Sequence, residues 1–223
     1  MPPDVPRVPI EAKSAGRTVS YVVGGTTEVL LSLVNLGCIA IHEMNCRTTS
    51  LDQPDWLAFD LDPSSDEFAD AAKVGRLLHK LLEELGIRSY PKTSGSRGLH
   101  VFAPLRRGPD QDVVRVCARR IGGLLARRAP DAVTLNPSKA ARGGRVYVDV
   151  QRNAFGQTIV IPYAVRRRPC APVSTPLDWD EVRTSLDPAR FNVRTIARRL
   201  ASTDPWADFW RHRQVLPNLA EAN

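Results

Sequence analysis

The sequence has little cysteine, and its few cysteines follow no pattern in which cysteine commonly acts. Four are present among 223 residues, and no two of them form a C-x-x-C pair. This spacing argues against a zinc ribbon and against a disulfide framework. We expect all four to be reduced, ordinary residues: Cys38, Cys46, Cys117 and Cys170.

Long apolar runs are also missing. No stretch approaches the roughly 18 apolar residues of a membrane span, and the N-terminus lacks the basic-then-apolar layout of a secretory signal. We therefore expect a cytoplasmic protein with no membrane partner. The phosphate-binding motif G-x-x-x-x-G-K-[ST] is absent as well, and we find no internal repeat.

The composition is that of a folded, basic protein. Hydrophobic residues make up 43% of the chain, which is enough for a substantial core. The formal net charge is +7, from 31 basic and 24 acidic residues. A basic balance favours polyanions as partners, although arginine-rich codon usage would give the same numbers. Composition alone leaves both explanations open.

The predicted elements do not alternate strictly between strand and helix, which favours an α+β fold. Residues 1–20 are rich in proline and polar residues, and we expect a flexible lead-in there. Ser64 and Glu67 have capping-box spacing before a helix, and residues 111–128 predict an amphipathic helix with Val113 and Val116 on its buried face. Strands are expected at 38–42, 56–61, 99–103, 145–150 and 158–163, and a helix at 27–36.

Two aspartates inside an apolar run are the most informative feature of the chain. Asp60 lies in the predicted strand Trp56 to Leu61, and Asp62 directly follows that strand. Residues two apart in a strand point to the same side. Two carboxylates that face one spot repel each other unless a cation lies between them. Asp149, at the end of a second alternating run, is a third candidate ligand, and three carboxylates suit a hard divalent metal. On the motif alone, an edge or turn with solvated acids remains an alternative.

The glycine-serine loop Lys92 to Gly98 resembles a cradle for phosphates. Two glycines free its backbone to turn N–H groups toward an anion, and side chains of the loop add donors. A plain hairpin turn is the alternative for this loop. The candidate donors are Ser94, Ser96, Arg97 and His100.

Two residues outside the loop are candidates for the same cleft. His42 ends a predicted strand shortly before Asp60, although a lone histidine at a strand end is often structural. Arg166 follows the strand after Asp149 and has the bidentate geometry that suits phosphate. His79 and His212 fit a structural role better.

Several segments, taken in order, resemble the polymerase domain of bacterial DNA ligase D, a member of the archaeo-eukaryotic primase superfamily. The resemblance covers roughly residues 20 to 185. It rests on N-L-G-C-I-A-I-H (35–42), D-Q-P-D-W-L-A-F-D-L-D-P (52–63), K-T-S-G-S-R-G-L-H (92–100), V-D (148–149) and P-Y (162–163).

The resemblance implies a primase-like fold, with mixed or antiparallel sheets and flanking helices around a central cleft, over one catalytic domain at 21–223. It implies a two-metal site that holds Mn²⁺ or Mg²⁺. The implied activity is extension of DNA primers, preferably with ribonucleotides, during non-homologous end joining. Asp60, Asp62 and Asp149 would hold the metals, and Asp149 would help to activate the primer 3′-hydroxyl. His42, Ser94, His100 and Arg166 match positions that bind the incoming triphosphate.

The expected partners are DNA ends or primer-template DNA and NTP or dNTP, with Ku and a separate DNA ligase as further candidates. Two departures from the family stand out. Arg97 takes a place where lysine is common, and only about 20 residues precede Tyr21, where the family has a longer region that grips the 5′-phosphate. We therefore expect a minimal, stand-alone version. A DNA-end binding or scaffolding module without catalysis, and a primase that makes its own primers, are the alternatives.

Overall fold

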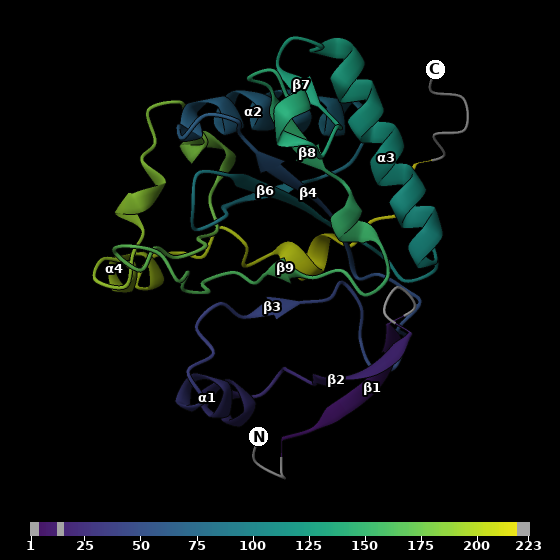
Figure 1. Ribbon diagram of the computed structural model, residues 1–223, viewed down its shortest axis with the longest axis vertical. Helices are drawn as coiled ribbons and strands as arrows, with labels where there is room; N and C mark the ends of the chain where they lie inside the picture. Colours follow the sequence, from purple (N-terminus) through teal and green to yellow (C-terminus); the bar gives the residue numbers. More distant parts are fainter. Residues whose placement is uncertain (1–4, 13–15, 218–223) are drawn as a thin grey trace.

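The computed structural model describes residues 5–12 and 16–217, which form an α+β fold around a five-stranded sheet (Figure 1). The strand order is β5-β6-β4-β8-β7, and all neighbours are antiparallel except β7 and β8, so the sheet is mixed. Its strands are β4 (Trp56–Asp62), β5 (Tyr90–Thr93), β6 (Leu99–Pro104), β7 (Val133–Thr134) and β8 (Val146–Asp149). The expected mixed sheet is therefore present.

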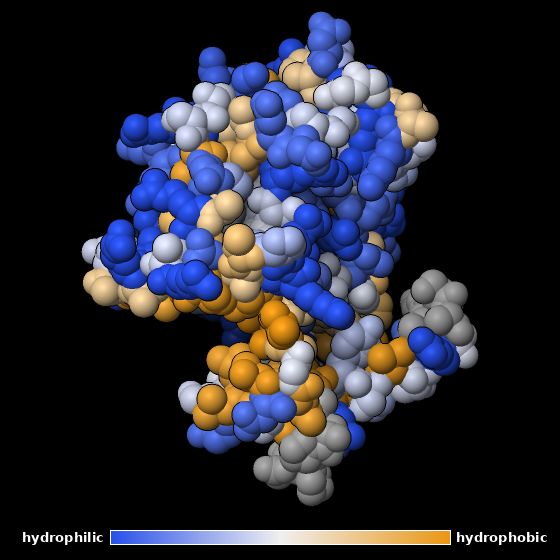
Figure 2. Space-filling view, turned by 60° about the vertical axis from the view of Figure 1, so that its left-hand side comes forward, coloured by the Kyte–Doolittle hydropathy of each residue, from blue (hydrophilic) through white to orange (hydrophobic). Residues whose placement is uncertain are grey.

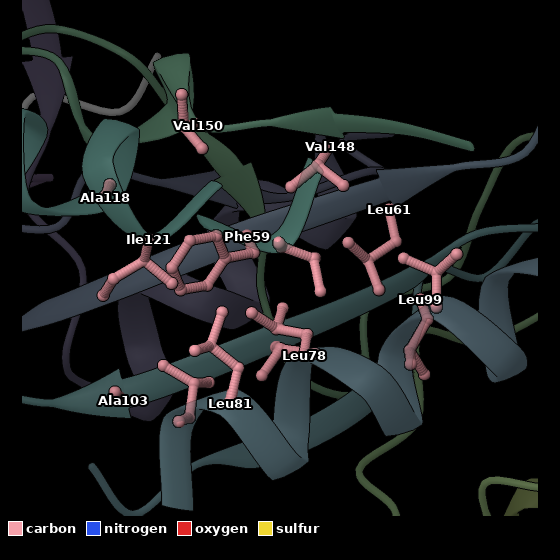
Figure 3. Close-up of a cluster of buried hydrophobic side chains, with 14 of the residues drawn as sticks. Phe59, Leu61, Leu78, Leu81, Leu99, Ala103, Ala118, Ile121, Val148 and Val150 are labelled. Atoms are coloured by element: carbon pink, nitrogen blue, oxygen red, sulfur yellow. The ribbon is translucent and has the colours of Figure 1, made fainter. Parts of the chain in front are cut away.

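One face of this sheet carries the main hydrophobic core. The helices α2 (Phe68–Glu84) and α3 (Gln111–Arg128) both pack on it. Figure 3 shows how Phe59 and Leu61 of β4 meet Leu78 of α2 and Ile121 of α3. These side chains are all 1% exposed or less. The alternation along β4 turns its odd-numbered residues to the helices and leaves its even-numbered residues, the two aspartates included, on the other face.

A smaller aromatic cluster lies on that other face. Trp56 and Phe102 from the sheet pack against Phe209, which the C-terminal part of the chain brings back over the strands. Trp206 stacks on Phe209 with ring centroids 5.0 Å apart. This cluster covers one end of the sheet face, and the polar residues of β4, β6 and β8 occupy the other.

The N-terminal segment corrects an expectation. The sequence predicts a flexible lead-in over residues 1–20, but β1 (Arg7–Ala12) and β2 (Arg17–Val22) form an antiparallel hairpin. Val5 and Ile10 are 4% and 5% exposed. Pro9 conceals the strand pattern in the sequence, yet a two-stranded ribbon tolerates a residue that cannot donate a ladder hydrogen bond. The lead-in prediction is wrong for residues 7–12 and 17–20; residues 1–4 and 13–15 lie outside the described part.

Helix α1 (Thr27–Asn35) lies beside this hairpin, below the main sheet in Figure 1. Its N-cap is Thr26, whose side chain accepts a hydrogen bond from the N–H of Val29, as the sequence predicts. Only Val29 of this helix is buried, and the apolar side chains Leu31 and Val34 are 57% and 55% exposed. The hairpin and α1 together form an N-terminal lobe, and Figure 2 shows the resulting hydrophobic surface on this lobe. Most apolar residues of α1 therefore lie outside the hydrophobic core.

The small two-stranded sheet of β3 (His42–Glu43) and β9 (Ile159–Val160) lies between that lobe and the main sheet in Figure 1. The strand expected at 38–42 is thus confined to its last residue and the one after it. Pairing of His42 with Val160 brings His42 toward the chain that follows β8. The remaining helix is α4 (Ile196–Leu200), and five short 3-10 turns complete the described elements.

Two local predictions about helices are wrong, each for a visible reason. The Ser64 hydroxyl donates to the carbonyl of Arg145, 2.6 Å away, so it does not cap α2, and Glu67 takes the N-cap position with no side-chain cap bond. In α3 the bounds agree with the prediction, but Val113 and Val116 are 51% and 42% exposed. The helix turns Ala118 and Gly122 inward instead, because small residues let it approach Val150 closely.

No helix within the described ranges is long and apolar enough to cross a bilayer.

Candidate active site

Four ionisable side chains form a single row across the sheet. Lys92 of β5 is the register partner of His100 on β6, His100 is the partner of Asp60 on β4, and Asp60 is the partner of Asp149 on β8. Register partners in neighbouring antiparallel strands place their side chains on the same face. The row therefore lies on the face away from α2 and α3. Asp62, two residues beyond Asp60, shares that face.

Each of the three aspartates has an arginine as its counter-ion. The Arg152 Nε lies 3.6 Å from Asp60 Oδ2 and 3.3 Å from Asp149 Oδ2, so one guanidinium serves both carboxylates. Asp62 Oδ2 accepts from Arg142 Nη1 at 3.1 Å. Asp149 Oδ1 accepts the N–H of Gln151 at 2.8 Å, which leaves Oδ2 for a cation. The like-charge repulsion expected between the acids is thus relieved by arginine.

The donors suit a hard divalent metal, since all three are carboxylates and all stand on one sheet face. Asp60 and Asp149 are direct register partners, which brings them together from positions 89 residues apart. In the part of the chain that the structure describes, no three His, Cys, Asp or Glu side chains are gathered closely enough to form a ready-made metal cage. The two-metal site therefore stays a prediction. It requires the guanidinium of Arg152 to move away from Asp60 and Asp149.

A pocket of about 310 Å³ opens next to the row. It gathers every residue expected to bind the nucleotide together with two of the three aspartates, while Asp149 is 9% exposed and is not among the lining residues. Five basic side chains line it, a strong concentration of positive charge beside the carboxylates. The lining residues are His42, Asp60, Asp62, Ser94, Ser96, Arg97, Gly98, His100, Lys139, Arg152, Thr158, Ile159, Val160, Arg166 and Arg168.

The loop between β5 and β6 is built around Ser94. Its Oγ accepts the N–H groups of Ser96 and Gly98, at 3.2 Å and 3.1 Å. Ser94 is 8% exposed, and its own hydroxyl proton has no acceptor among the described residues, so it is available to a ligand in the pocket. Gly95 has a φ of +70°, the left-handed conformation that glycine adopts without strain. The loop has the features expected of an anion cradle.

The two arginines expected to bind phosphate are held in different ways. Arg166 Nη1 donates to the carbonyl of Ser94 at 3.2 Å, which ties it to the loop. Arg97 forms an ion pair with the exposed Asp66, so its charge is partly committed at the pocket edge. Arg166 is therefore the better placed of the two for a ligand.

The histidines of the pocket are neutral. Burial and the nearby charges of Arg166 and Arg152 lower the pKa of His42. Burial, followed by the charge of Lys92, lowers the pKa of His100 to about 4. Burial would raise the pKa of Asp60, but His100, Arg152 and Lys92 outweigh it and the net shift is downward. The site thus combines an ionised carboxylate with neutral imidazoles, which can donate hydrogen bonds to an anion.

A larger cavity, of about 910 Å³, lies between the end of α2 and residues 203–208. Its lining includes Trp179, Tyr90 and four acidic residues but none of the candidate site residues. Size alone would favour it. Its acidic lining does not suit the polyanions that a basic protein attracts, so the smaller pocket is the better candidate site.

Comparison with known proteins identifies the family of this chain. The family model described as the LigD primase-polymerase domain matches residues 1–206. The chain belongs to the LigD primase-polymerase domain family. A Pseudomonas aeruginosa relative, "Multifunctional non-homologous end joining protein LigD", is 35% identical over 193 residues, which cover 85% of this chain and 23% of that protein. A Bacillus subtilis relative, "Bifunctional non-homologous end joining protein LigD", is 32% identical over 88% of this chain and 33% of its own length.

A solved structure supports the fold. The polymerase domain from Mycobacterium tuberculosis ligase D in complex with DNA superimposes with a TM-score of 0.84 at 26% identity, over 96% of this chain and 77% of that chain. The expected primase-like fold is therefore confirmed. The chain spans about a quarter to a third of the length of the first curated relatives it matches, so the activities of those whole LigD proteins come to it only as proposals.

The sequence prediction missed several charged residues in and around this site, among them Lys92, Arg142 and Arg152. A lysine in a hairpin strand, opposite a histidine in the hairpin register, was a usable signal for the first. Arg152 follows Asp149 by three residues in a 3-10 turn, a spacing that folds the guanidinium back on the carboxylate. Arg142 gave no signal, because its contact with Asp62 spans 80 residues of chain.

Proposed function

We propose that this chain is a metal-dependent nucleotidyltransferase that extends DNA primers in non-homologous end joining. The observation that carries the proposal is the register pair Asp60 and Asp149 beside a pocket lined with five basic side chains. In-line displacement at phosphorus needs carboxylates that hold metal ions and cations that neutralise a triphosphate, and this pocket offers both. Membership of the LigD primase-polymerase domain family supports the same reading.

The chain's own residues suggest how the reactants are held. Asp60, Asp62 and Asp149 would ligate two divalent ions, which supply Lewis acidity to the attacking and leaving oxygens. Arg166 and the free hydroxyl proton of Ser94 would bind the triphosphate from one side of the pocket. His42 and His100, both neutral, would donate from the other side. Asp149 would accept the proton of the primer 3′-hydroxyl, since only one of its oxygens is engaged by the backbone.

The finer parts of the proposal rest on the family. We retain Mn²⁺ as the preferred ion, Mg²⁺ as the alternative, and ribonucleotides as the preferred substrates. DNA ends are the expected polymeric partner, in keeping with the net charge of +7 and with a relative solved in complex with DNA. Ku and a separate DNA ligase are the expected protein partners, and the cytoplasm, where bacterial DNA lies, is the expected location.

A second candidate is a DNA-end binding module without catalysis. The observation that favours it is the neutralisation of all three carboxylates by Arg152 and Arg142, which makes the cluster stable without metal. A primase that starts chains without a primer is a third candidate in the same chemical class. These readings differ in what the protein does to a primed template.

The deciding experiment is extension of a labelled primer on a gapped template with Mn²⁺ and either NTPs or dNTPs. We expect extension by the wild type and a loss of about a thousandfold in Asp60→Asn, because a carboxylate that would hold the metal ions is removed. Asp112→Asn is the matched control, since Asp112 is exposed on α3 and forms its ion pair with Arg115, away from the pocket. Absence of extension by the wild type would overturn the proposed function and favour the binding module. Full activity of Asp60→Asn would show that the reaction does not use this carboxylate, which also overturns the proposal. Dinucleotide synthesis without primer would identify a primase.

A further inference from the structure

Lys92 is an ionisable residue buried completely inside the fold. Its exposure is 0%, and its Nζ has two polar contacts: His100 Nδ1 at 3.0 Å and Ser174 Oγ at 2.6 Å. Ser174 is also 0% exposed. Burial of a lysine is costly unless its donors are matched, so this arrangement is a built feature of the sheet.

The direction of each hydrogen bond around Lys92 follows from the number of protons available. The Ser174 hydroxyl has one proton, and it donates that proton to the carbonyl of Thr93 at 2.8 Å. Ser174 Oγ therefore accepts from Lys92. An amine, charged or neutral, has enough protons to donate to Ser174 and to His100 at once. While Lys92 is charged, its ammonium has no lone pair, so His100 Nδ1 is the acceptor.

The other ring nitrogen of His100 faces the active site. Nε2 lies 3.3 Å from Asp60 Oδ1, and both residues line the pocket. An imidazole that accepts at Nδ1 and is neutral carries its proton at Nε2. Lys92 then donates to one side of the His100 ring, and the N–H on the other side faces the Asp60 carboxylate and the pocket.

We propose that Lys92 is a positioning residue that fixes His100 as its Nε2–H tautomer and aims that N–H into the pocket. Without Lys92 the two tautomers of His100 would compete, and the Nδ1–H form would present a bare nitrogen to the anionic ligand. The role of this N–H toward a triphosphate rests on the function proposed above. The tautomer itself does not depend on that function.

Proton-detected ¹⁵N spectroscopy of the histidine rings tests the tautomer directly. The chain has only four histidines, and His100→Gln identifies the signals of interest. We expect wild-type His100 to show a protonated Nε2 and a bare Nδ1. In Lys92→Met, which keeps the length of the side chain but removes the donor, we expect these two signals to move toward a tautomer mixture. Lys80→Met, at an exposed position on α2, should leave them unchanged.

Binding supplies a second readout. Lys92→Met should weaken the binding of an NTP with Mn²⁺ about tenfold, the effect of one hydrogen bond to a charged group, with the affinity for DNA unchanged. A wild-type His100 protonated at Nδ1 overturns the proposal, and so does a Lys92→Met spectrum identical to that of the wild type. The wild-type spectrum decides the tautomer even where the variant fails to fold. A wild type with the expected tautomer but no primer extension overturns the proposed function and upholds the positioning role.

Discussion

Asp60 and Asp149 are register partners on adjacent strands, and the guanidinium of Arg152 lies 3.6 Å from the first carboxylate and 3.3 Å from the second. The pairing of β4 with β8 places the two carboxylates side by side, so the fold itself makes their like charges repel each other. A cation between them relieves this repulsion. Arg152 provides one in the protein alone, and a bridging metal ion would compete with it for the same oxygens.

Replacement of Arg152 by glutamine should separate these two roles. Without metal we expect the free energy of unfolding to fall by about 1 kcal/mol, a modest value because the Arg152 side chain is 36% exposed. With Mn²⁺ we expect a larger rise in Tm than in the wild type, because the ion no longer competes with a guanidinium. Thermal melting with and without Mn²⁺ measures both effects.

The control for that experiment is Arg115→Gln, which removes an exposed ion pair with Asp112 on α3. It should change neither the Tm nor its response to Mn²⁺. An Arg152→Gln protein whose Tm responds to Mn²⁺ no more than that of the wild type would show that the ion does not compete with Arg152 for Asp60 and Asp149.

Asn153 should be essential for the stability of this end of the sheet. It is 0% exposed, its Oδ1 accepts the N–H of Ala58 at 2.8 Å, and its Nδ2 donates to the carbonyls of Ala58 and Val150 at 2.7 Å and 2.9 Å. The side chain thus continues the pairing of β4 where β8 ends. Asn153→Asp sets a carboxylate against two carbonyl oxygens, and we expect a loss of about 3 kcal/mol in urea unfolding.

Asn136→Asp is the matched substitution at an exposed site. Asn136 Oδ1 accepts the N–H of Ser138, and an aspartate keeps that acceptor. We expect its free energy of unfolding to stay within about 0.5 kcal/mol of the wild-type value. Equal losses in the two variants would show that the bonds to Ala58 contribute nothing specific.

Gly98 should tolerate no side chain. A Cβ there would lie 2.7 Å from the carbonyl oxygen of Leu61 and 3.3 Å from Ser94 Oγ, so Gly98→Ala must move the backbone or the serine. We expect a loss of about 1 to 3 kcal/mol and weaker nucleotide binding, because the cradle is displaced. Gly123→Ala is the contrast, since its Cβ would meet only the end of Arg127. We expect that variant to gain up to about 1 kcal/mol. A neutral Gly98→Ala would contradict the tight packing of this loop.

Local patterns in the sequence were sufficient for the elements that hold the site. The alternation around Asp60 predicted β4, the glycine-serine loop predicted the β5–β6 turn, and the spacing of apolar residues predicted the bounds of α3. Contacts across long stretches of chain were not accessible in this way. Lys92 reaches Ser174 over 82 residues, and no pattern in the neighbourhood of either residue indicates the partner.

The N-terminal hairpin escaped prediction for a different reason. Proline at position 9 and polar residues between the apolar ones obscured the alternation, and local propensity does not show that Ile10 is buried. The buried face of α3 was predicted only in part: Ile121 and Leu125 are buried as expected, but Val114, Ala118 and Gly122 pack inward in place of Val113 and Val116. In both places tertiary packing, which local sequence patterns do not show, determined which residues are buried.

The pH dependence of stability should report the burial of Lys92. Burial lowers the pKa of its ammonium from 10.5 to about 7. Between these two values the unfolded chain binds more protons than the folded protein, so the free energy of unfolding should rise with pH, by at most about 1.4 kcal/mol per unit. Urea unfolding at pH 7, 8 and 9 measures this slope. Tyr90, Tyr147 and Tyr163, whose pKa values burial raises to about 12, oppose it only above about pH 10.

Lys92→Met lacks the titrating group, so its stability should change less with pH over this window. The difference between the wild type and Lys92→Met should therefore grow in favour of the wild type by about 2 kcal/mol from pH 7 to pH 9. Lys80→Met, at an exposed position on α2, should follow the wild-type curve. Parallel curves for the wild type and Lys92→Met would mean that Lys92 keeps its ordinary pKa in the folded protein. The lysine would then remain fully charged at the pH at which the nucleotide binds, and His100 would face a permanent cation at its Nδ1.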